Sequence, residues 1–233
     1  SSQSTIYQLK KPLRPYQEVG VMWMDLIQYG VVGDPVGTGK TPTVLGYCHK
    51  QLIDGLANKF LIVAPKTLTY QWIEDGLEKF MPDIHLDYVL VGGNKREREA
   101  AWKKDRIFTI VHYDAVREDF DFIRDFEWDV LIADEAQKIR NQDTLTAKCM
   151  RQIKAKQRFA ATATLVENNT DEFYGVYRFV HPGLLGNFNK FKKDFSIRGV
   201  KDRYKAARKN RVKNELINKV KPYFIRRPKS LIA

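Results

Sequence analysis

The sequence of 233 residues predicts an α/β fold, in which a parallel sheet of about seven strands lies between two layers of helices. Two observations lead to this prediction. Short apolar runs recur along the first 182 residues, and they are too short for helices but suit buried strands. Longer stretches with apolar residues at helical spacing separate these runs, and this alternation is typical of a parallel sheet covered on both faces. In such folds, ligands bind beyond the carboxyl ends of the strands.

The same two patterns place the individual strands and helices. The expected strands are residues 31–32, 60–64, 86–91, 107–111, 130–133 and 158–161. The expected helices are residues 15–29, 44–56, 67–80, 97–104, 114–125 and 144–153. In the first helix, Val19, Trp23 and Ile27 recur at a spacing of four residues, so we expect them to form its buried face.

The chain is a neutral body followed by a strongly basic segment. Its net charge is +12, but residues 187–233 hold 16 Lys or Arg and three acids, a net of +13. The first 186 residues hold the other 24 basic and 25 acidic groups. A basic segment of this density indicates a polyanionic partner, most simply nucleic acid, although a solvated helix face has the same composition.

The alternation of strands and helices ends near Pro182. No further strand is expected after it, and residues 188–195 and 201–220 are expected to be basic helices. We therefore divide the chain into a sheet domain at 1–182 and a basic helical appendage at 183–233. Because the chain begins at Ser1 without Met, we expect it to be a piece of a longer protein.

Composition excludes several classes of protein. With 43% hydrophobic and 12% aromatic residues, the chain is not a disordered tail or linker. Cys48 and Cys149 are far apart and the four histidines are scattered, so the sequence has no metal-ligand motif. No apolar run approaches the ~20 residues that span a membrane, and there is no signal peptide. We expect reduced thiols, no membrane partner and an intracellular location, cytoplasmic or, in a eukaryote, nuclear.

Residues 33–41, Gly-Asp-Pro-Val-Gly-Thr-Gly-Lys-Thr, predict a phosphate-binding loop. They lie between an expected strand and an expected helix, which is the setting that such a loop needs. Gly37 and Gly39, on either side of Thr38, allow the backbone N–H groups to turn toward a phosphate, and the helix N-terminus adds partial positive charge. Lys40 can reach the β- and γ-phosphates of a nucleotide.

This loop departs from the strict G-x-x-x-x-G-K-[ST] pattern at one position. Asp34 stands where the first glycine belongs, whereas the G-x-G-K-T core fits and ends at Thr41, whose hydroxyl can ligate Mg²⁺. Pro42 costs little in the first turn of a helix, but it biases Thr41 away from helical angles. The alternative is a Gly-rich turn with an incidental lysine.

A second signal lies several strands later in the sequence. Residues 129–137 predict an apolar strand that ends in Asp134 and Glu135, at the same sheet edge as the phosphate loop. Asp134 can hold Mg²⁺ directly or through water, and Glu135 can orient or deprotonate an attacking water. The alternative is an ordinary acidic loop. Together with the phosphate loop, the pair indicates Mg²⁺-dependent binding and hydrolysis of a nucleoside triphosphate.

Further motifs follow one another along the chain. They are Leu13-Arg14-Pro15-Tyr16-Gln17, Ala64-Pro65-Lys66-Thr67-Leu68 with Gln71-Trp72, His112-Tyr113-Asp114, residues 134–141, Thr162-Ala163-Thr164-Leu165 with Glu167-Asn168-Asn169, residues 181–186 and residues 221–227. In this order, and with the phosphate loop, they resemble the first RecA-like lobe of SWI/SNF-type DNA translocases in helicase superfamily two. The resemblance runs from Leu13 to Ile232, and the last two motifs distinguish the family from RNA helicases with Asp-Glu-Ala-Asp boxes.

The resemblance implies a three-layer RecA-like P-loop fold with ATP and Mg²⁺ as cofactors. Gln17, in a motif with Arg14, would read the adenine edge, because an amide can both donate and accept a hydrogen bond. Lys40 would contribute to catalysis with the two acids, and Gln137 would sense the γ-phosphate. Because His is commoner at that position, Gln137 resembles microbial and viral members.

The resemblance also implies partners. Double-stranded DNA would be bound through its backbone without sequence preference, and a second RecA-like lobe of the same full-length protein would follow the chain. The residues implied in DNA contact are Pro65, Lys66, Thr67 and Tyr113. Trp72, near them, is equally compatible with core packing. Thr162 and Thr164 would couple the ATP and DNA sites, although Ala163 and Leu165 depart from the usual Thr-Gly-Thr-Pro.

We expect the parent protein to be an ATP-dependent translocase on double-stranded DNA, with this chain as its ATP-binding first lobe. ATP hydrolysis is expected of the full-length protein, and the isolated chain is expected to be nearly inactive. Two alternatives stay open: an RNA helicase or restriction-complex motor of the same superfamily, and a nucleotide- or DNA-binding module without turnover. Remodelling, branch migration, repair and restriction all use such a motor.

Overall fold

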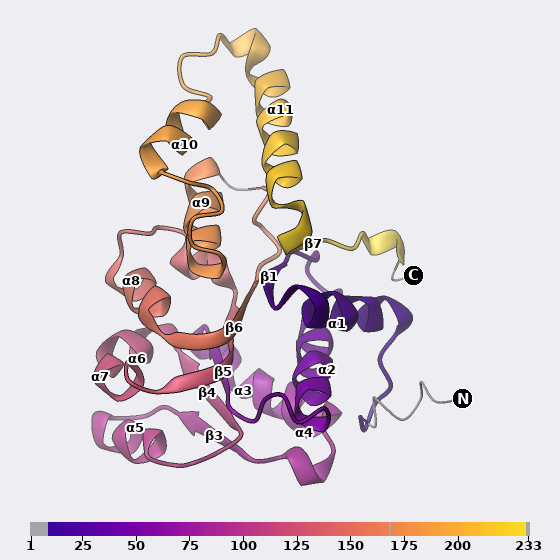
Figure 1. Ribbon diagram of the computed structural model, residues 1–233, viewed down its shortest axis with the longest axis vertical. Helices are drawn as coiled ribbons and strands as arrows, with labels where there is room; N and C mark the ends of the chain where they lie inside the picture. The colour runs from indigo at the N-terminus through magenta and orange to yellow at the C-terminus, as the bar shows by residue number, and fades with distance from the viewer. Residues whose placement is uncertain (1–8, 168, 232–233) are drawn as a thin grey trace.

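The computed structural model describes residues 9–167 and 169–231, and within them it contains a seven-stranded parallel sheet (Figure 1). The strands are β1 (Tyr29–Val32), β2 (Phe60–Ala64), β3 (Tyr88–Val91), β4 (Phe108–His112), β5 (Glu127–Asp134), β6 (Lys154–Ala161) and β7 (Phe224–Ile225). They lie in the order β3-β4-β2-β5-β6-β1-β7, and every neighbouring pair is parallel. Asn168 and Ile232, which the sequence analysis named, lie outside the described residues.

Helices connect the strands and cover the sheet. They are α1 (Pro15–Ile27), α2 (Lys40–Ile53), α3 (Thr69–Gln71), α4 (Glu78–Phe80), α5 (Lys95–Trp102), α6 (Tyr113–Glu118), α7 (Phe120–Ile123), α8 (Leu145–Gln152), α9 (Thr170–Val180), α10 (Phe188–Phe195) and α11 (Asp202–Val220). Short 3₁₀ helices occupy Lys66–Leu68, Asp83–His85, Ala136–Ile139, Lys221–Tyr223 and Lys229–Leu231. None of the described helices is long and apolar enough to cross a membrane.

The sheet separates two hydrophobic cores. In β2 every residue is buried, and neighbouring side chains point to opposite faces. Leu61 and Val63 belong to the core that includes residues of α6, α8 and α9, whereas Ile62 belongs to the core that includes residues of α1 and α2. A strand buried on both faces has the continuous apolar sequence that predicted it. The predicted three-layer α/β fold is therefore confirmed.

The buried face of α1 differs from the prediction. Of the three expected residues, Trp23 and Ile27 are partly buried against the core, but Val19 is 56% exposed. The buried residues of α1 are Gln17, Gly20, Val21 and Met24. The inward side of α1 packs closely on Arg227, because a Cβ at Gly20 would lie 2.3 Å from the Arg227 guanidinium. The apolar spacing alone could not reveal a charged residue from the far end of the chain.

The predicted helix at 67–80 is interrupted in the structure. The chain forms a 3₁₀ turn, then α3, then a π-helical segment at Trp72–Leu77, and finally α4. A π segment widens the turn, and such segments are frequent at functional sites. Trp72, the first residue of this segment, is 3% exposed.

The segment after Pro182 contains one element that the sequence analysis did not expect. The basic helices α10 and α11 are present, but the chain then returns to the sheet as β7, which pairs with β1. The expectation of no further strand is therefore wrong, since a two-residue strand has no periodicity to detect. Figure 1 shows α10 and α11 projecting beyond the sheet and β7 beside β1. The helix α9, just before Pro182, was also not expected.

The register of the sheet brings the candidate motifs together. Asp134 at the end of β5 pairs with Ala161 of β6, which pairs with Val32 of β1. On the other side of β5, Ala64 of β2 pairs with His112 of β4. The segments that follow these five strands therefore leave the sheet along one edge, and the prediction that the acidic pair shares an edge with the phosphate loop is confirmed.

Candidate nucleotide-binding site

The phosphate loop joins β1 to α2 in the conformation that its glycines allow. Gly37 and Gly39 have φ angles of 81° and 78°, left-handed values that favour glycine. Thr38 between them is 2% exposed, and its hydroxyl donates to the Pro35 carbonyl oxygen at 2.7 Å. The Thr38 side chain therefore stabilises the turn from inside.

Lys40 begins α2 and bends back across the loop. Its Nζ donates to the carbonyl oxygen of Asp34 at 3.2 Å. Thr41 and Pro42 lie in the first turn of α2, so the proline does not exclude Thr41 from the helix. The first N–H groups of a helix lack intrahelical partners and carry partial positive charge. The loop, the helix start and Lys40 can thus hold a phosphate chain.

Asp34, which replaces the first glycine of the strict motif, forms a buried ion pair with Arg227. Its carboxylate accepts from the Arg227 main-chain N–H at 2.8 Å, from Nε at 3.1 and 3.2 Å, and from a terminal guanidinium nitrogen. Asp34 is fully buried and Arg227 is 5% exposed. The loop is therefore fixed to the segment that follows β7.

Arg227 also reaches α1 and α2. Its guanidinium donates to the Tyr16 carbonyl oxygen and to the Thr43 hydroxyl, and it lies over the Tyr16 ring at 5.5 Å. The sequence analysis placed Arg227 only within the motif at residues 221–227 and did not find this role. An acid in a glycine position was the available signal, because a buried carboxylate needs a cation.

The residues expected at the adenine side lie against the loop. The Gln17 side chain is 6% exposed; it accepts from the Arg14 N–H at 2.9 Å and donates to the Gly39 carbonyl oxygen at 3.4 Å. Tyr16 donates its hydroxyl to the Thr38 carbonyl oxygen at 2.5 Å. The Arg14 residue is exposed. Adenine recognition by Gln17 and Arg14 stays a prediction, while the structure gives Gln17 a second task, to anchor α1 on the loop.

Asp134 is held by groups from three different segments. Its carboxylate accepts from Trp72 Nε1 at 2.8 Å and from the Glu135 N–H at 3.0 Å, and its carbonyl oxygen accepts from the Tyr113 hydroxyl at 2.5 Å. Burial raises the pKa of Asp134 above its ordinary value, while the Trp72 hydrogen bond and the charge of Lys40 act in the opposite direction. The Trp72 indole and the Glu135 N–H thus fix the orientation of the Asp134 carboxylate, the predicted Mg²⁺ ligand.

Glu135 begins a series of side-chain contacts along the sheet edge. This series, which we call the relay, consists of Glu135, Gln137, Thr162 and Thr164. Glu135 has a left-handed backbone, with φ 49°, which is uncommon for a residue with a side chain and marks local strain. Its carboxylate accepts from Gln137 Nε2 at 2.5 Å, and Gln137 Oε1 accepts from the Thr162 hydroxyl at 3.0 Å. The Thr162 and Thr164 hydroxyls lie 3.4 Å apart. The structure therefore connects Glu135 and Gln137, two of the predicted catalytic residues, to the predicted coupling residues Thr162 and Thr164.

The residues expected to contact DNA divide into two groups. Lys66 and Thr67 are exposed, and Pro65 is half-buried, at the end of β2. Tyr113 instead is 6% exposed and turned inward, where its hydroxyl holds Asp134. As it lies, the Tyr113 ring at the start of α6 supports Asp134 and does not face a DNA backbone.

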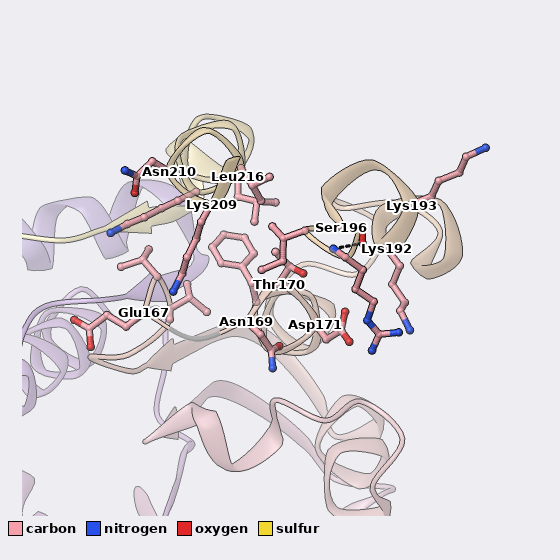
Figure 2. Close-up of a pocket in the computed structure, with 17 residues that line it drawn as sticks. Glu167, Asn169, Thr170, Asp171, Lys192, Lys193, Ser196, Lys209, Asn210 and Leu216 are labelled. Atoms are coloured by element: carbon pink, nitrogen blue, oxygen red, sulfur yellow. Dashed lines mark hydrogen bonds between the residues drawn. The ribbon is translucent and has the colours of Figure 1, made fainter. Parts of the chain in front are cut away.

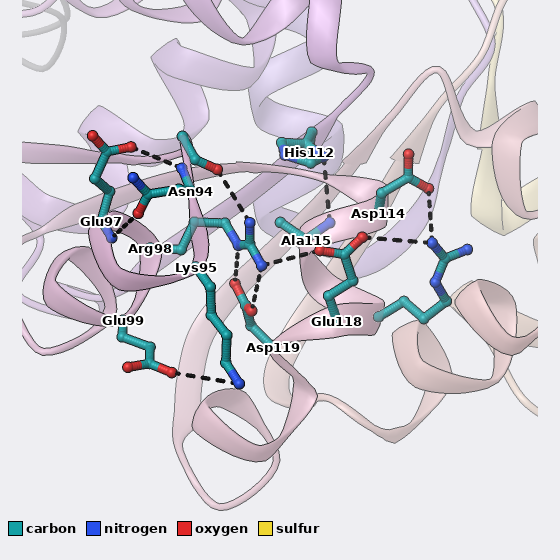
Figure 3. A network of polar contacts seen from close by, with 12 residues as sticks. Asn94, Lys95, Glu97, Arg98, Glu99, His112, Asp114, Ala115, Glu118 and Asp119 are labelled. Carbon is teal, nitrogen blue, oxygen red and sulfur yellow. Dashed lines mark hydrogen bonds and ion pairs between the residues drawn. The ribbon is translucent and has the colours of Figure 1, made fainter.

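A cluster of ion pairs fixes α6 beside this edge (Figure 3). The Arg98 guanidinium on α5 donates to both carboxylate oxygens of Asp119 at 2.8 and 3.2 Å and to Glu118 at 3.0 Å, and Trp102 Nε1 also donates to Asp119. Burial lowers the pKa of His112, and its Nδ1 accepts from the Ala115 N–H at the start of α6. The helix that begins with Tyr113 is thus held at both ends.

The donor set at the edge suits one kind of metal. No group of three or more His, Cys, Asp or Glu residues within 9–167 and 169–231 could hold a metal ion by itself. Mg²⁺ is normally bound by one or two carboxylates, phosphate oxygens and waters and needs no such cage. Asp134 and the Thr41 hydroxyl offer oxygen donors, the type of ligand that Mg²⁺ takes.

Comparison with known protein families identifies the family to which the chain belongs. Residues 16–233 match the model of the SNF2-related domain. The chain belongs to this family. Among structures, this SNF2-related domain is similar to the Sulfolobus solfataricus SWI2/SNF2 ATPase core in complex with dsDNA, with a TM-score of 0.82 and 28% identity over 96% of this chain and 46% of that one.

Curated relatives of this SNF2-related domain are much longer proteins. The rice SNF2 domain-containing protein ENL1 is 29% identical and the Saccharomyces cerevisiae ISWI chromatin-remodeling complex ATPase ISW1 is 25% identical, each over 94% of this chain. The zebrafish DNA excision repair protein ERCC-6-like is 30% identical, also over 94%. The chain spans 24%, 20% and 16% of these relatives, respectively.

The buried pair of the SNF2-related domain leads to a stability prediction. Asp34→Asn leaves the Arg227 guanidinium buried without a counter-charge, so the free energy of unfolding should fall by about 3–5 kcal/mol. Adding Arg227→Met to Asp34→Asn should recover part of the loss, because no unpaired charge remains. Urea denaturation monitored by circular dichroism measures all three chains.

A surface pair serves as the matched control. Arg211 and Glu215 form an exposed ion pair at 2.8 Å on α11, and Glu215→Gln should change the free energy of unfolding by less than about 1 kcal/mol. If Asp34→Asn lowered the free energy of unfolding no more than Glu215→Gln does, the Asp34–Arg227 pair would not have the structural importance assigned to it.

Proposed function

We propose that this chain is the ATP-binding lobe of a DNA-dependent ATPase that translocates on double-stranded DNA. One observation carries the proposal: the sheet register aligns the phosphate loop, the Thr162 segment and Asp134–Glu135 along one edge. Membership of the SNF2-related domain family supports it. We assign the nucleotide site to residues 1–182 and regard 183–233 as a basic excursion that leads onward from the lobe.

In this proposal the chain contributes binding and orientation to phosphoryl transfer. The loop amides and Lys40 hold the β- and γ-phosphates, and Gln17 and Arg14 lie on the adenine side. Mg²⁺, held by Asp134 and Thr41, supplies positive charge beside the phosphates. Glu135 orients the attacking water, and Gln137 links Glu135 to Thr162, so that a change at the γ-phosphate is transmitted to the Thr162–Thr164 segment.

Duplex DNA is the proposed partner for two reasons. The structural neighbour named above is a complex with dsDNA. The exposed Lys66 and Thr67 lie at the same edge as the nucleotide site, and the basic segment 187–233 adds a net charge of +13. Phosphate contacts of this kind position a protein on DNA without reading sequence. A DNA partner also favours an intracellular location.

Nucleotide binding by residues 1–233 tests the first step. Lys40→Ala removes a charge-assisted contact worth roughly 1.5–3 kcal/mol, so its affinity for a fluorescent ATP analogue should fall by about one to two decades. Lys148→Ala, an exposed lysine on α8, is the matched control and should leave the affinity unchanged. Equal affinities of the Lys40→Ala and parent chains would contradict the assignment of the loop.

Turnover by the isolated chain should be very slow, with or without DNA. Phosphoryl transfer needs positive charge beside the γ-phosphate, and an arginine finger contributes about 10³–10⁵ in rate. Within the chain, the two arginines after β7 are both engaged elsewhere: Arg226 lies 3.4 Å from Glu167, and Arg227 is paired with Asp34. We therefore expect the second lobe of the full-length protein to supply this charge.

A steady-state phosphate-release assay measures this turnover. DNA-stimulated release on the order of 1 s⁻¹ or faster, abolished by Glu135→Gln, would show that the lobe is self-sufficient. Binding of ATP with no turnover even in the full-length protein would instead favour a nucleotide-binding module.

DNA binding should be electrostatic and insensitive to sequence. Each phosphate that the chain neutralises steepens the slope of log affinity against log salt by about 0.9, so Lys66→Ala should reduce the slope by about 1. Lys148→Ala should leave the slope unchanged. Binding isotherms at several salt concentrations on two unrelated duplexes provide the measurement, and a flat salt dependence or a strong preference for one duplex would refute the expectation.

A further inference from the structure

A cavity of about 910 Å³ lies between α9, α10 and α11 (Figure 2). It is lined by exposed lysines such as Lys192, Lys193 and Lys209, which belong to the basic segment 187–233 that the proposed function assigns to DNA. The cavity therefore adds no partner of another kind. The π-helical segment Trp72–Leu77, in contrast, contacts the nucleotide site at two places that lie four residues apart.

The first residue of this segment holds one proposed Mg²⁺ ligand. Trp72 Nε1 donates to Asp134 Oδ2 at 2.8 Å, and the two residues are 3% and 8% exposed. An indole has a single N–H, so this bond uses its whole hydrogen-bonding capacity. Because Oδ1 accepts from the Glu135 N–H at 3.0 Å, both carboxylate oxygens are oriented, and each keeps a further lone pair for a metal ion or its waters.

A second residue of the segment packs on the other proposed ligand. A Cβ at Gly76 would lie 3.4 Å from Thr41 Cγ2 and 3.2 Å from Leu45 Cδ1, so the segment lies directly against the start of α2. Contact with the methyl group restricts the rotation of the Thr41 side chain about its Cα–Cβ bond. Since the methyl and the hydroxyl share one Cβ atom, the same contact restricts the direction of the Thr41 hydroxyl.

The wide turn of the segment places both contacts on one face. The Glu78 N–H bonds to the Ile73 carbonyl oxygen five residues earlier, which is the π-helical pattern. Residues four to five positions apart in such a turn point in nearly the same direction, and Trp72 and Gly76 are both buried. The large Trp72 side chain reaches the end of β5, whereas Gly76, without a side chain, lets α2 approach.

We propose that the segment Trp72–Leu77 is the positioning element of the Mg²⁺ site, in which Trp72 orients Asp134 and Gly76 orients Thr41. The inference rests on the proposed function, because it takes Asp134 and Thr41 as the metal ligands. These ligands come from separate elements, β5 and α2, and one segment that contacts both fixes their relative placement. Mg²⁺ demands near-ideal octahedral geometry, so a small displacement of either ligand weakens its binding.

Nucleotide binding with and without the metal tests the inference. The affinity of the 233-residue chain for a fluorescent ATP analogue is measured in excess Mg²⁺ and in EDTA, and the ratio of the two affinities is called the magnesium gain. We expect a gain of about tenfold or more for the parent chain. Trp72→Phe keeps an aromatic ring but removes the N–H, and it should lower the gain to less than about threefold. Its affinity in EDTA should equal that of the parent chain, because the phosphate loop and Lys40 are unchanged.

A second tryptophan provides the matched control. Trp102 Nε1 donates to Asp119 at 3.0 Å, outside the nucleotide site, and Arg98 still holds Asp119 when this N–H is removed. Trp102→Phe should therefore keep the magnesium gain of the parent chain.

A pair of glycine variants tests the second contact. Gly76→Val places a branched side chain against Thr41, and it should lower the magnesium gain as Trp72→Phe does. Gly92→Val is its control, because a Cβ at Gly92 would meet no atom within 4 Å, and it should keep the parent gain. Circular dichroism and the affinity in EDTA check that each variant keeps its fold and its phosphate loop.

The outcomes separate the inference from the proposed function. A parent-like gain in both Trp72→Phe and Gly76→Val would overturn the inference and leave the proposed function in place. So would losses of affinity that are equal in Mg²⁺ and in EDTA, since they would mean general support of the loop. A loss of gain in Trp72→Phe alone would overturn the role assigned to Gly76. The absence of any magnesium gain in the parent chain would contradict the proposed function, and the inference with it.

Discussion

The buried ion pair between Asp34 and Arg227 is the contact on which the geometry of the nucleotide site depends. Two buried charges are tolerated only when each is paired and hydrogen-bonded, and here the carboxylate receives the Arg227 main-chain N–H as well as its guanidinium. Because Asp34 opens the phosphate loop and Arg227 follows β7, the pair joins residues 193 positions apart. The same guanidinium touches Tyr16 and Thr43, so α1, the loop, α2 and the last strand are fixed relative to one another.

Asp134, at the centre of the sheet edge, is also held by residues that lie far from it in the sequence. Its carboxylate is oriented by Trp72, from the π-helical segment after β2, and its main chain by Tyr113, from the end of β4. Both segments belong to the motifs that we associate with DNA contact. A shift of either segment on DNA would therefore reach the acid through a direct hydrogen bond, which provides a physical basis for coupling between the two proposed sites.

The residue after Asp134, Glu135, is connected by hydrogen bonds to the segment that follows β6. Glu135, held in a left-handed conformation, is bonded to Gln137, and Gln137 to Thr162. The Thr162 hydroxyl lies in turn 3.4 Å from the Thr164 hydroxyl. The two departures from the usual Thr-Gly-Thr-Pro are both buried, at Ala163 and Leu165, while the hydroxyls of the relay are kept. The substitutions thus change packing beneath the relay and leave its polar contacts in place.

The sequence by itself determined the first six strands, the three-layer fold and the phosphate loop, because these depend on local signals: apolar runs, helical spacing and glycines at fixed positions. It also placed Asp134 and Glu135 at the correct edge, since parallel strands share a carboxyl end. Tertiary structure alone decided that Val19 faces solvent, that the chain returns as β7, and that Trp72, Tyr113 and Arg227 support the acids of the site. The reason is physical: the partner of a buried polar group is chosen by packing in three dimensions, and these partners lie far apart along the chain.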